Sequence, residues 1–276
     1  MNIFTTIWQS IVLGMAQGLT EFLPISSSGH LALLQRVLGF RLGPSMTFIS
    51  VMLHLGTLIS LCIVFFKDIL ALFKRPLKPL FMLIVATVPA GLVGVLWGDK
   101  INELFEGARG LFYLAICFAC TAVMLLVCEI VAKRRKKHAP LGWRHAVPMG
   151  LAQAVALFPG ISRSGSTIVA GTVSGARREN VAKFSFLMSI PVILGSVLVE
   201  GLGFIKQPPQ LEAGTGGTLS LVLGIVFGVV FAAVSGLFAI KAMLKVIQKA
   251  NYKWFSLYLV LLSMACFSLD ALQIFG

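Results

Sequence analysis

Residues 14–30, GMAQGLTEFLPISSSGH, recur as residues 150–166, GLAQAVALFPGISRSGS. The offset is 136 residues, almost half of the 276-residue chain, and eight of the 17 paired positions are identical without a gap. Each copy ends in a turn rich in serine and glycine. The first copy alone carries a carboxylate and an imidazole, Glu21 and His30, and the second alone carries Arg163. An internal duplication with complementary charges predicts that the two turns meet and form one site.

The composition identifies the class of protein. The chain is 58% hydrophobic and 12% charged, with a mean hydropathy of +0.94. A soluble domain of this length carries more charge, so we expect a polytopic membrane protein. The formal net charge of +13 comes mostly from lysines and arginines between apolar segments. That pattern is typical of cytoplasmic loops, and we predict no nucleic-acid partner.

Short apolar segments flank the turn in each copy. They are residues 3–16 and 31–40 in the first half, and 146–158 and 167–175 in the second. Each is shorter than the about 20 residues that a helix needs to cross the hydrocarbon layer. Two short helices around a turn predict a re-entrant hairpin, in which irregular backbone at membrane depth is buried in protein or lines a wet cavity. We place the hairpins at residues 3–40 and 146–175.

Six longer apolar segments predict spanning helices: Met46–Phe66, Leu80–Gly98, Leu111–Val131, Phe184–Ile205, Thr218–Ile240 and Trp254–Phe275. The predicted fold is therefore an all-α membrane domain with two repeats, 1–132 and 146–276, joined by a basic connector, 133–145. Three spans in each half, with hairpins that add none, place the second repeat upside down relative to the first. This is an inverted-topology repeat. Gly224 and Gly228, spaced as G-x-x-x-G, predict close helix packing.

The basic residues of the loops predict the orientation. One side carries 17 of them: Lys67, Lys74, Arg75, Lys78, Lys133, Arg134, Arg135, Lys136, Lys137, Arg144, Arg177, Arg178, Lys183, Lys241, Lys245, Lys249 and Lys253. The other side carries five: Arg36, Arg41, Lys100, Arg109 and Lys206. The first side is predicted to be cytoplasmic, so both termini and the mouth of the first hairpin face outward.

Gln17 and Glu21 are four residues apart, so they share one face of a helix. A carboxylate beside an amide at membrane depth can bind a hard cation such as Mg²⁺, which keeps water ligands and binds phosphate. The alternative is a buried glutamate that only forms hydrogen bonds with the serine turn. Glu129, Glu200 and Asp270 lie near the ends of spans, where we expect solvated or snorkelling carboxylates.

Arg163 lies between two serines in PGISRSGST. A guanidinium group binds phosphate through two parallel hydrogen bonds, and hydroxyl and N–H groups of a turn that begins a helix add further donors. We therefore predict phosphate binding by Arg163, Ser162 and Ser164. The alternative, compatible with the first, is an ion pair with Glu21 that joins the two halves.

His30 follows Ser26, Ser27 and Ser28, and an imidazole beside a hydroxyl can activate a nucleophile or protonate a leaving group. The triple serine alone is a weak signal, because such turns also allow close helix packing. His54, in the middle of a span, is interpreted as a hydrogen-bonded packing residue.

The segments QGLTEFLPISSSGH at 17–30 and PGISRSGST at 159–167 together resemble the undecaprenyl-diphosphate phosphatase family, the bacterial bacitracin-resistance proteins. That family has an (E/Q)-x-x-x-E motif before a serine turn and a P-G-x-S-R-S-x-x-T motif in its second half. Both occur here in order, and the length and the duplicated plan agree over the whole chain. Gln17 stands where many relatives carry glutamate, which leaves one carboxylate fewer for a metal.

The resemblance implies hydrolysis of undecaprenyl diphosphate to undecaprenyl phosphate and inorganic phosphate in the cytoplasmic membrane of a bacterium, recycling the carrier lipid for cell-wall synthesis. It implies the following site: Gln17 and Glu21 with a divalent cation, Mg²⁺ or Ca²⁺; Ser27 as the proposed nucleophile; His30 in proton transfer; Arg163 on phosphate, with Ser26, Ser162, Ser164 and Thr167 in support.

The sequence leaves open whether Ser27 or a water molecule attacks, and it predicts no oligomeric state. A site at the membrane midplane between inverted hairpins is also the plan of many transporters. A flippase for lipid phosphates or anions is therefore the alternative function. A purely structural bundle leaves the buried charges of Glu21 and Arg163 unexplained.

Overall fold

The computed structural model describes residues 3–39, 44–134, 139–206, 215–249 and 251–274. Within these ranges the chain forms helices: α1 Ile3–Glu21, α2 Ser27–Val37, α3 Pro44–Val64, α4 Phe66–Leu72, α5 Lys78–Glu106, α6 Gly110–Arg134, α7 Trp143–Val155, α8 Arg163–Val173, α9 Arg178–Lys206, α10 Thr215–Lys249 and α11 Lys253–Ala271. Residues 135–138 of the predicted connector 133–145, and residues 207–214, lie outside the described residues.

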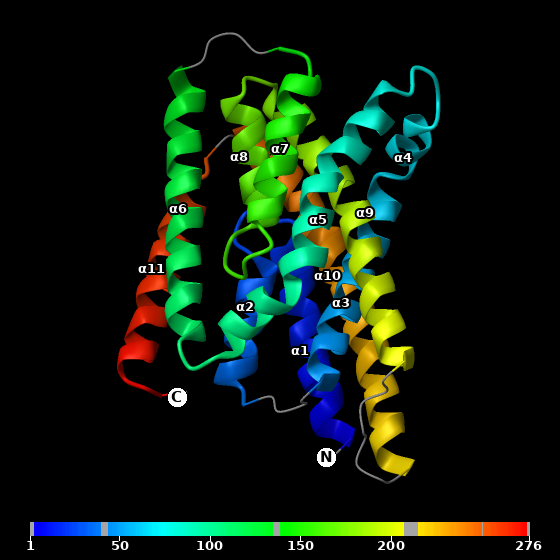
Figure 1. The fold of residues 1–276 in the computed structure, drawn as a ribbon, viewed down its shortest axis with the longest axis vertical. Coiled ribbons are helices and arrows are strands. Elements are labelled where there is room, and N and C mark those ends of the chain that lie inside the picture. Colours follow the sequence, from blue (N-terminus) through cyan, green and yellow to red (C-terminus); the bar gives the residue numbers. More distant parts are fainter. Residues whose placement is uncertain (1–2, 40–43, 135–138, 207–214, 250, 275–276) are drawn as a thin grey trace.

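The described helices form a membrane bundle (Figure 1). Five of them, α5, α6, α9, α10 and α11, are long and apolar enough to cross a bilayer. The pair α3 and α4, bent by 81° at Phe65, counts as a sixth if it is taken as one span. The predicted class, an all-α polytopic membrane protein, is therefore confirmed.

The two short hairpins, α1 with α2 and α7 with α8, enter the bundle from opposite ends, and their turns lie near mid-height (Figure 1). The first arm is longer than predicted: α1 runs through 19 residues to Glu21 instead of ending near residue 16. Gln17, Thr20 and Glu21 are polar, which made the apolar segment look short. All three side chains are buried and hydrogen-bonded, so they extend the helix instead of ending it.

Three helix pairs link the first half of the sequence to the second. The first arm of each hairpin packs against the middle span of the other half, α1 on α10 and α7 on α5, while α6 packs on α11. At the first of these contacts the backbones of Gly14 and Gly228 meet, and a Cβ on Gly14 would overlap the Gly228 carbonyl. The predicted role of the G-x-x-x-G segment in close helix packing is thus confirmed.

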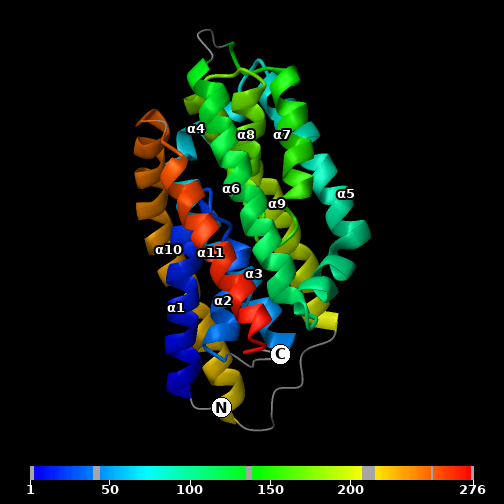
Figure 2. The ribbon, with the colours of Figure 1, turned by 90° about the vertical axis from the view of Figure 1, so that its left-hand side faces the viewer.

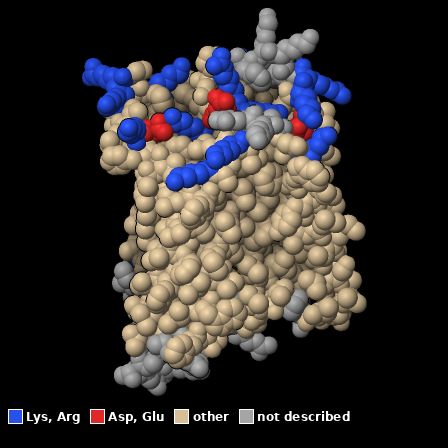
Figure 3. All heavy atoms as spheres, turned by 180° about the vertical axis from the view of Figure 1, so that it is seen from behind, with Lys and Arg blue, Asp and Glu red and all other residues tan. Residues whose placement is uncertain are grey.

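The two ends of the bundle differ in charge. The helix α1 begins and α11 ends at the same end (Figures 1 and 2). At the opposite end, where α6 ends and α7 begins, lysines and arginines gather on the face seen in Figure 3. One prediction is wrong here: Glu129 is 1% exposed instead of solvated. Its carboxylate pairs with Lys133 at 3.1 Å and accepts a hydrogen bond from the Tyr252 N–H at 3.3 Å.

Candidate active site

The two repeated turns have the same local structure. Ser26 caps the N-terminus of α2, because its Oγ accepts a hydrogen bond from the Gly29 N–H at 3.3 Å. Ser162 caps α8 in the same way, accepting from the Gly165 N–H at 3.0 Å. A serine cap satisfies one of the free N–H groups at a helix start. Both turns therefore begin a short helix at the same position of the repeat.

The turns touch each other directly. The Gly160 N–H donates to Ser26 Oγ at 3.1 Å, and Ser164 Oγ donates to the Leu23 carbonyl at 2.9 Å. A Cβ on Gly29 would lie 2.9 Å from the Gly160 Cα, so only glycine allows this approach. Ser26 has a φ of 69°, which a residue other than glycine adopts rarely and which is typical of constrained functional turns. The two hairpins thus form a single centre.

Glu21 connects the other residues of this centre through its carboxylate, and the residue is 7% exposed. Its Oε1 accepts a hydrogen bond from Arg163 Nη2 at 2.6 Å. Its Oε2 accepts from Ser27 Oγ at 2.5 Å and from Gln17 Nε2 at 3.0 Å. Three residues that the sequence assigned to the site are therefore each hydrogen-bonded to a fourth, Glu21.

The side chain of Arg163 forms hydrogen bonds with two helices, α1 and α9. Besides the ion pair with Glu21, its Nη1 donates to the Ser185 carbonyl of α9 at 3.2 Å. The side chain is 15% exposed. The ion pair that the sequence offered as an alternative is present, and phosphate binding remains compatible with it.

The remaining predicted phosphate-binding side chains face inward. Ser26, Ser162, Ser164 and Thr167 are each at most 3% exposed. Thr167 Oγ1 is bonded to the Arg163 carbonyl at 2.8 Å and to Ser185 Oγ at 2.6 Å. These hydroxyl groups fix the turns and the start of α8, so the structure gives them a positioning role.

His30 lies apart from the Glu21 cluster in the described contacts. Its Nδ1 is 2.7 Å from the Ser26 carbonyl, and its Nε2 is 2.6 Å from the hydroxyl of Tyr258, on which the ring stacks. Because a carbonyl only accepts, Nδ1 carries the proton and Nε2 accepts from Tyr258. The sequence contains no signal that Tyr258 contacts the site, because nothing in the apolar α11 segment distinguishes this residue.

His54 lies closer to the carboxylate than His30 does. Its Nδ1 is bonded to the Ser50 carbonyl at 2.8 Å, and its Nε2 is 3.7 Å from Glu21 Oε2. The residue is hydrogen-bonded, as expected from the sequence, but its ring faces the candidate site instead of only packing. The sequence feature that points to a role in the site is the position of this polar residue in the middle of an apolar span.

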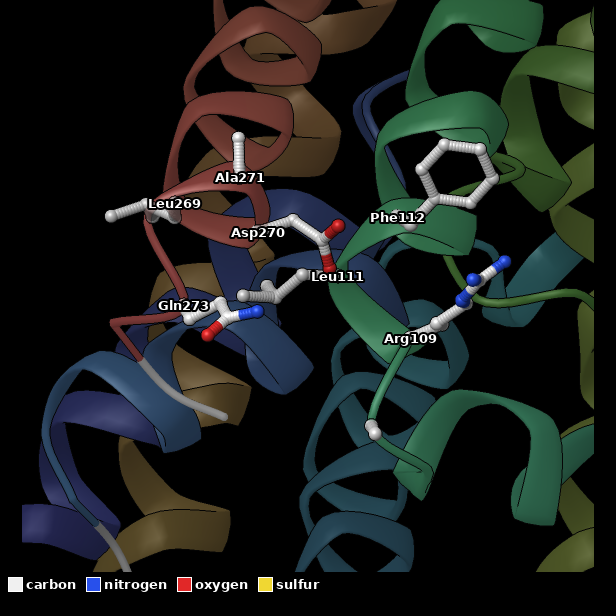
Figure 4. A pocket seen from close by; sticks show the side chains of 8 residues that line it. Arg109, Leu111, Phe112, Leu269, Asp270, Ala271 and Gln273 are labelled. Carbon is white, nitrogen blue, oxygen red and sulfur yellow. The ribbon is translucent and has the colours of Figure 1, made fainter.

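A cavity of about 710 Å³ lies elsewhere, between the start of α6 and the end of α11 (Figure 4). Arg109, Phe112, Asp270 and Gln273 line it. It shares no residue with the Glu21 cluster. We therefore assign the candidate active site from its chemistry and not from the size of a cavity.

The centre is arranged for an anion. Two helix N-termini, those of α2 and α8, meet there, and each brings first-turn N–H groups and the positive end of a helix dipole. The guanidinium group of Arg163 adds further donors. The charges of Glu21 and Arg163 cancel, so the side chains themselves supply no excess positive charge.

Comparison with known proteins agrees with this reading. The model of the family "Bacitracin resistance protein BacA" matches residues 10–265. A protein of Carboxydothermus hydrogenoformans named undecaprenyl-diphosphatase is 39% identical, with 96% of this chain and 97% of the relative covered. Proteins of the same name from Halothermothrix orenii and Methanobrevibacter smithii are 39% and 38% identical, and the matches cover 91% of this chain and 93% and 92% of those relatives. The chain belongs to the BacA family of bacitracin resistance proteins.

Proposed function

We propose that this protein hydrolyses undecaprenyl diphosphate to undecaprenyl phosphate and inorganic phosphate, and so returns the carrier lipid to cell-wall synthesis. The observation that carries the proposal is the hydrogen-bonded cluster of Glu21, Ser27 and Arg163 where the two helix N-termini meet. The name shared by relatives at 33–39% identity supports this substrate. The polyprenyl tail stays in the bilayer or between the helices.

The structure suggests how the diphosphate is held. Its oxygens accept hydrogen bonds from the first-turn N–H groups of α2 and α8 and from the Arg163 guanidinium. Phosphoryl transfer depends mainly on positioning and on charge stabilisation, which fixed donors provide without rearranging during the reaction. Ser26, Ser162, Ser164 and Thr167 keep these donors in place through the hydrogen bonds between the two turns.

Ser27 is the nucleophile in this mechanism. Its hydroxyl donates to Glu21 at 2.5 Å, so the carboxylate receives the proton as Oγ attacks the terminal phosphorus. The bond from this phosphorus to the bridging oxygen breaks, and undecaprenyl phosphate leaves. Water then hydrolyses the phosphoserine, which releases inorganic phosphate and restores the Ser27 hydroxyl.

A divalent cation, Mg²⁺ or Ca²⁺, would bind beside Glu21. The donors there fit a hard cation: one carboxylate, the Ser27 hydroxyl and Gln17 Oε1, which is buried without a hydrogen-bond partner among the described residues. The described residues contain no cluster of three histidine, cysteine or acidic side chains. Water and the diphosphate would complete the coordination. The cation would offset the negative charge of the substrate, which the neutral Glu21–Arg163 pair leaves unbalanced.

The protein lies in the cytoplasmic membrane with both termini on the outer side, and its two halves form an inverted repeat. The charged end of the bundle supports this orientation, because cytoplasmic ends carry the excess of lysine and arginine. The hairpins that enter from opposite ends support the inversion, as do the paired contacts of α1 with α10 and α7 with α5.

The decisive test is phosphate release by the purified protein in detergent, where no second compartment exists. A phosphatase releases inorganic phosphate from undecaprenyl diphosphate, and Ser27→Ala abolishes this release. After a rapid acid quench, labelled phosphate from the terminal position remains on wild-type protein and not on the Ser27→Ala variant. A folded protein that moves lipid across vesicles but releases no phosphate is the transporter instead.

A further inference from the structure

The short helix α4 lies at the end of the bundle where lysines and arginines gather (Figures 1 and 3). It follows α3 directly, and the chain bends by 81° between the two helices. Because α3 runs along the bundle (Figure 1), a helix at this angle to it is nearly parallel to the membrane surface. The bend therefore places α4 in the plane of that surface.

One face of α4 exposes large apolar side chains. Phe66, Leu70 and Phe73 are 59%, 49% and 66% exposed, and spacings of four and three residues bring them to the same side of a helix. On another side, Leu72 is buried in the protein core and Ile69 packs against that core. The exposed apolar face is unfavourable in water, whereas the boundary between lipid headgroups and acyl chains would cover it.

Unpaired positive charge lies beside this face. Four exposed basic residues lie on α4 or follow it directly: Lys67, Lys74, Arg75 and Lys78. None of the four takes part in an ion pair in the described part of the chain. Lys67 and Lys74 are seven residues apart, two helical turns, so both lie on the same edge of the apolar face.

The acidic residue of α4 does not cancel this charge. Asp68 pairs with Lys183 of α9 at 2.5 Å. The pair ties α4 to the bundle and thereby fixes which side of the helix is turned outward. An amphipathic helix with a row of lysines beside its apolar face is typical of binding to anionic membrane surfaces.

We propose that α4 is an interfacial helix that binds the headgroups of anionic phospholipids. Phe66, Leu70 and Phe73 enter the boundary of the acyl chains, and Lys67 and Lys74 bind the lipid phosphates at its edge. An anionic headgroup fits better than a zwitterionic one, because it brings no positive charge of its own to four unpaired cations. A free phosphate ion would match the charge and leave the apolar face uncovered. The inference does not rest on the proposed phosphatase reaction.

Lipid titration of the purified full-length protein in detergent, followed by native mass spectrometry, tests the charges. Phosphatidylglycerol and phosphatidylcholine with the same acyl chains are the two probes. In the triple variant Lys67→Gln, Lys74→Gln, Arg75→Gln we expect affinity for phosphatidylglycerol to fall by roughly 5-fold for each residue, about 10²-fold in all. Affinity for phosphatidylcholine should stay unchanged.

A matched control removes the same charge elsewhere. Lys241, Lys245 and Lys253 are also exposed and were predicted to lie on the same side of the membrane as α4. Their triple replacement by glutamine should leave phosphatidylglycerol binding within about 2-fold of the wild type. Thermal unfolding adds a second readout, because a lipid that binds the folded protein stabilises it. Phosphatidylglycerol should raise the unfolding temperature of the wild type and the control, and not that of the α4 variant.

The depth of α4 is tested without changing its charges. A spin label on Phe73→Cys, in a variant without the five native cysteines, is measured in phosphatidylglycerol vesicles. We expect it to be more accessible to oxygen, which enters the bilayer, than to a water-soluble nickel complex. A label on Arg177→Cys, an exposed position, should show the opposite preference.

Four results overturn the proposal. The first is an equal loss of phosphatidylglycerol binding in the control, which would reduce the site to a general property of the basic end. The second is a label at residue 73 that reports water. The third is displacement of the lipid by inorganic phosphate, which would indicate a site for free anions. The fourth is a Leu70→Ser, Phe73→Ser variant that keeps its lipid but changes its size in size-exclusion chromatography, which would show that a second copy of the chain covers this face.

Discussion

Arg163 Nη2 lies 2.6 Å from Glu21 Oε1, so a guanidinium group of the second half and a carboxylate of the first half form a part-buried ion pair. The pair joins the start of α8 to the end of α1 across 142 residues of sequence. Removing one partner of such a pair leaves a buried charge uncompensated, at a cost of about 3–5 kcal/mol. The pair therefore both joins the halves and sets the charge of the site.

Arg163→Lys tests whether this residue also binds phosphate. Lysine keeps the charge near Glu21 but loses the planar fork, so we expect phosphate release to fall by about 10²-fold while the thermal unfolding temperature changes little. Phosphate release and thermal unfolding are measured on the same purified sample. A stable lysine variant with nearly full activity would remove Arg163 from the phosphate site and leave it a structural role.

Chelation tests the cation. We expect a chelator to abolish phosphate release and Mg²⁺ or Ca²⁺ to restore it. Glu21→Gln should lose about 10²-fold in rate, because a ligand and its charge disappear together. Direct binding of Mn²⁺, followed by electron paramagnetic resonance, should weaken in the same variant. A rate that chelators do not change would mean that Glu21 acts without a metal.

Gly29 tests the contact between the two turns. In Gly29→Ala the new methyl group would lie 2.7 Å from Phe118 Cζ and 2.9 Å from the Gly160 Cα. Forcing an extra carbon into a packed site costs about 1–3 kcal/mol, so thermal stability and activity should both fall. Gly91→Ala is the matched control, because a Cβ there meets no atom within 4 Å. Equal behaviour of the two variants would contradict the close approach.

Tyr258 tests how His30 is positioned. Tyr258→Phe keeps the stacked ring but removes the hydroxyl that lies 2.6 Å from His30 Nε2. Loss of one hydrogen bond predicts a decrease in kcat of roughly 3- to 10-fold. His30→Ala, which also loses the contact with the Ser26 carbonyl, should be slower. Full activity of Tyr258→Phe would show that this bond is dispensable for the reaction.

Labelling tests the orientation. Single cysteines in place of Arg134 and Gln273, in a variant without the five native cysteines, mark opposite ends of the bundle. We expect a membrane-impermeant maleimide, added to intact cells, to label residue 273 and to miss residue 134. Both should react after the membrane is permeabilised. The reverse pattern in intact cells would invert the orientation without affecting the site.

The sequence by itself determined the features that depend on local chemistry. Long apolar segments predicted the spans, because an exposed backbone in lipid must form helices. The repeated serine turns predicted a short helix after each turn, at residues 31–40 and 167–175. Both helices begin four residues earlier, at Ser27 and Arg163, because a serine side chain caps each start. Complementary charges at Glu21 and Arg163 predicted a contact between the halves.

The tertiary structure alone decided which other groups reach the carboxylate and how the turns are supported. His54 was interpreted as packing, and Tyr258 and Ser185 were not considered, because their partners are distant in sequence: the bond from Tyr258 to His30 crosses 228 residues. The polar end of α1 looked like the end of a helix because its burial against the second turn is not visible locally. Such contacts depend on how the helices pack. The sequence around a residue does not show which distant residues will pack against its side chain.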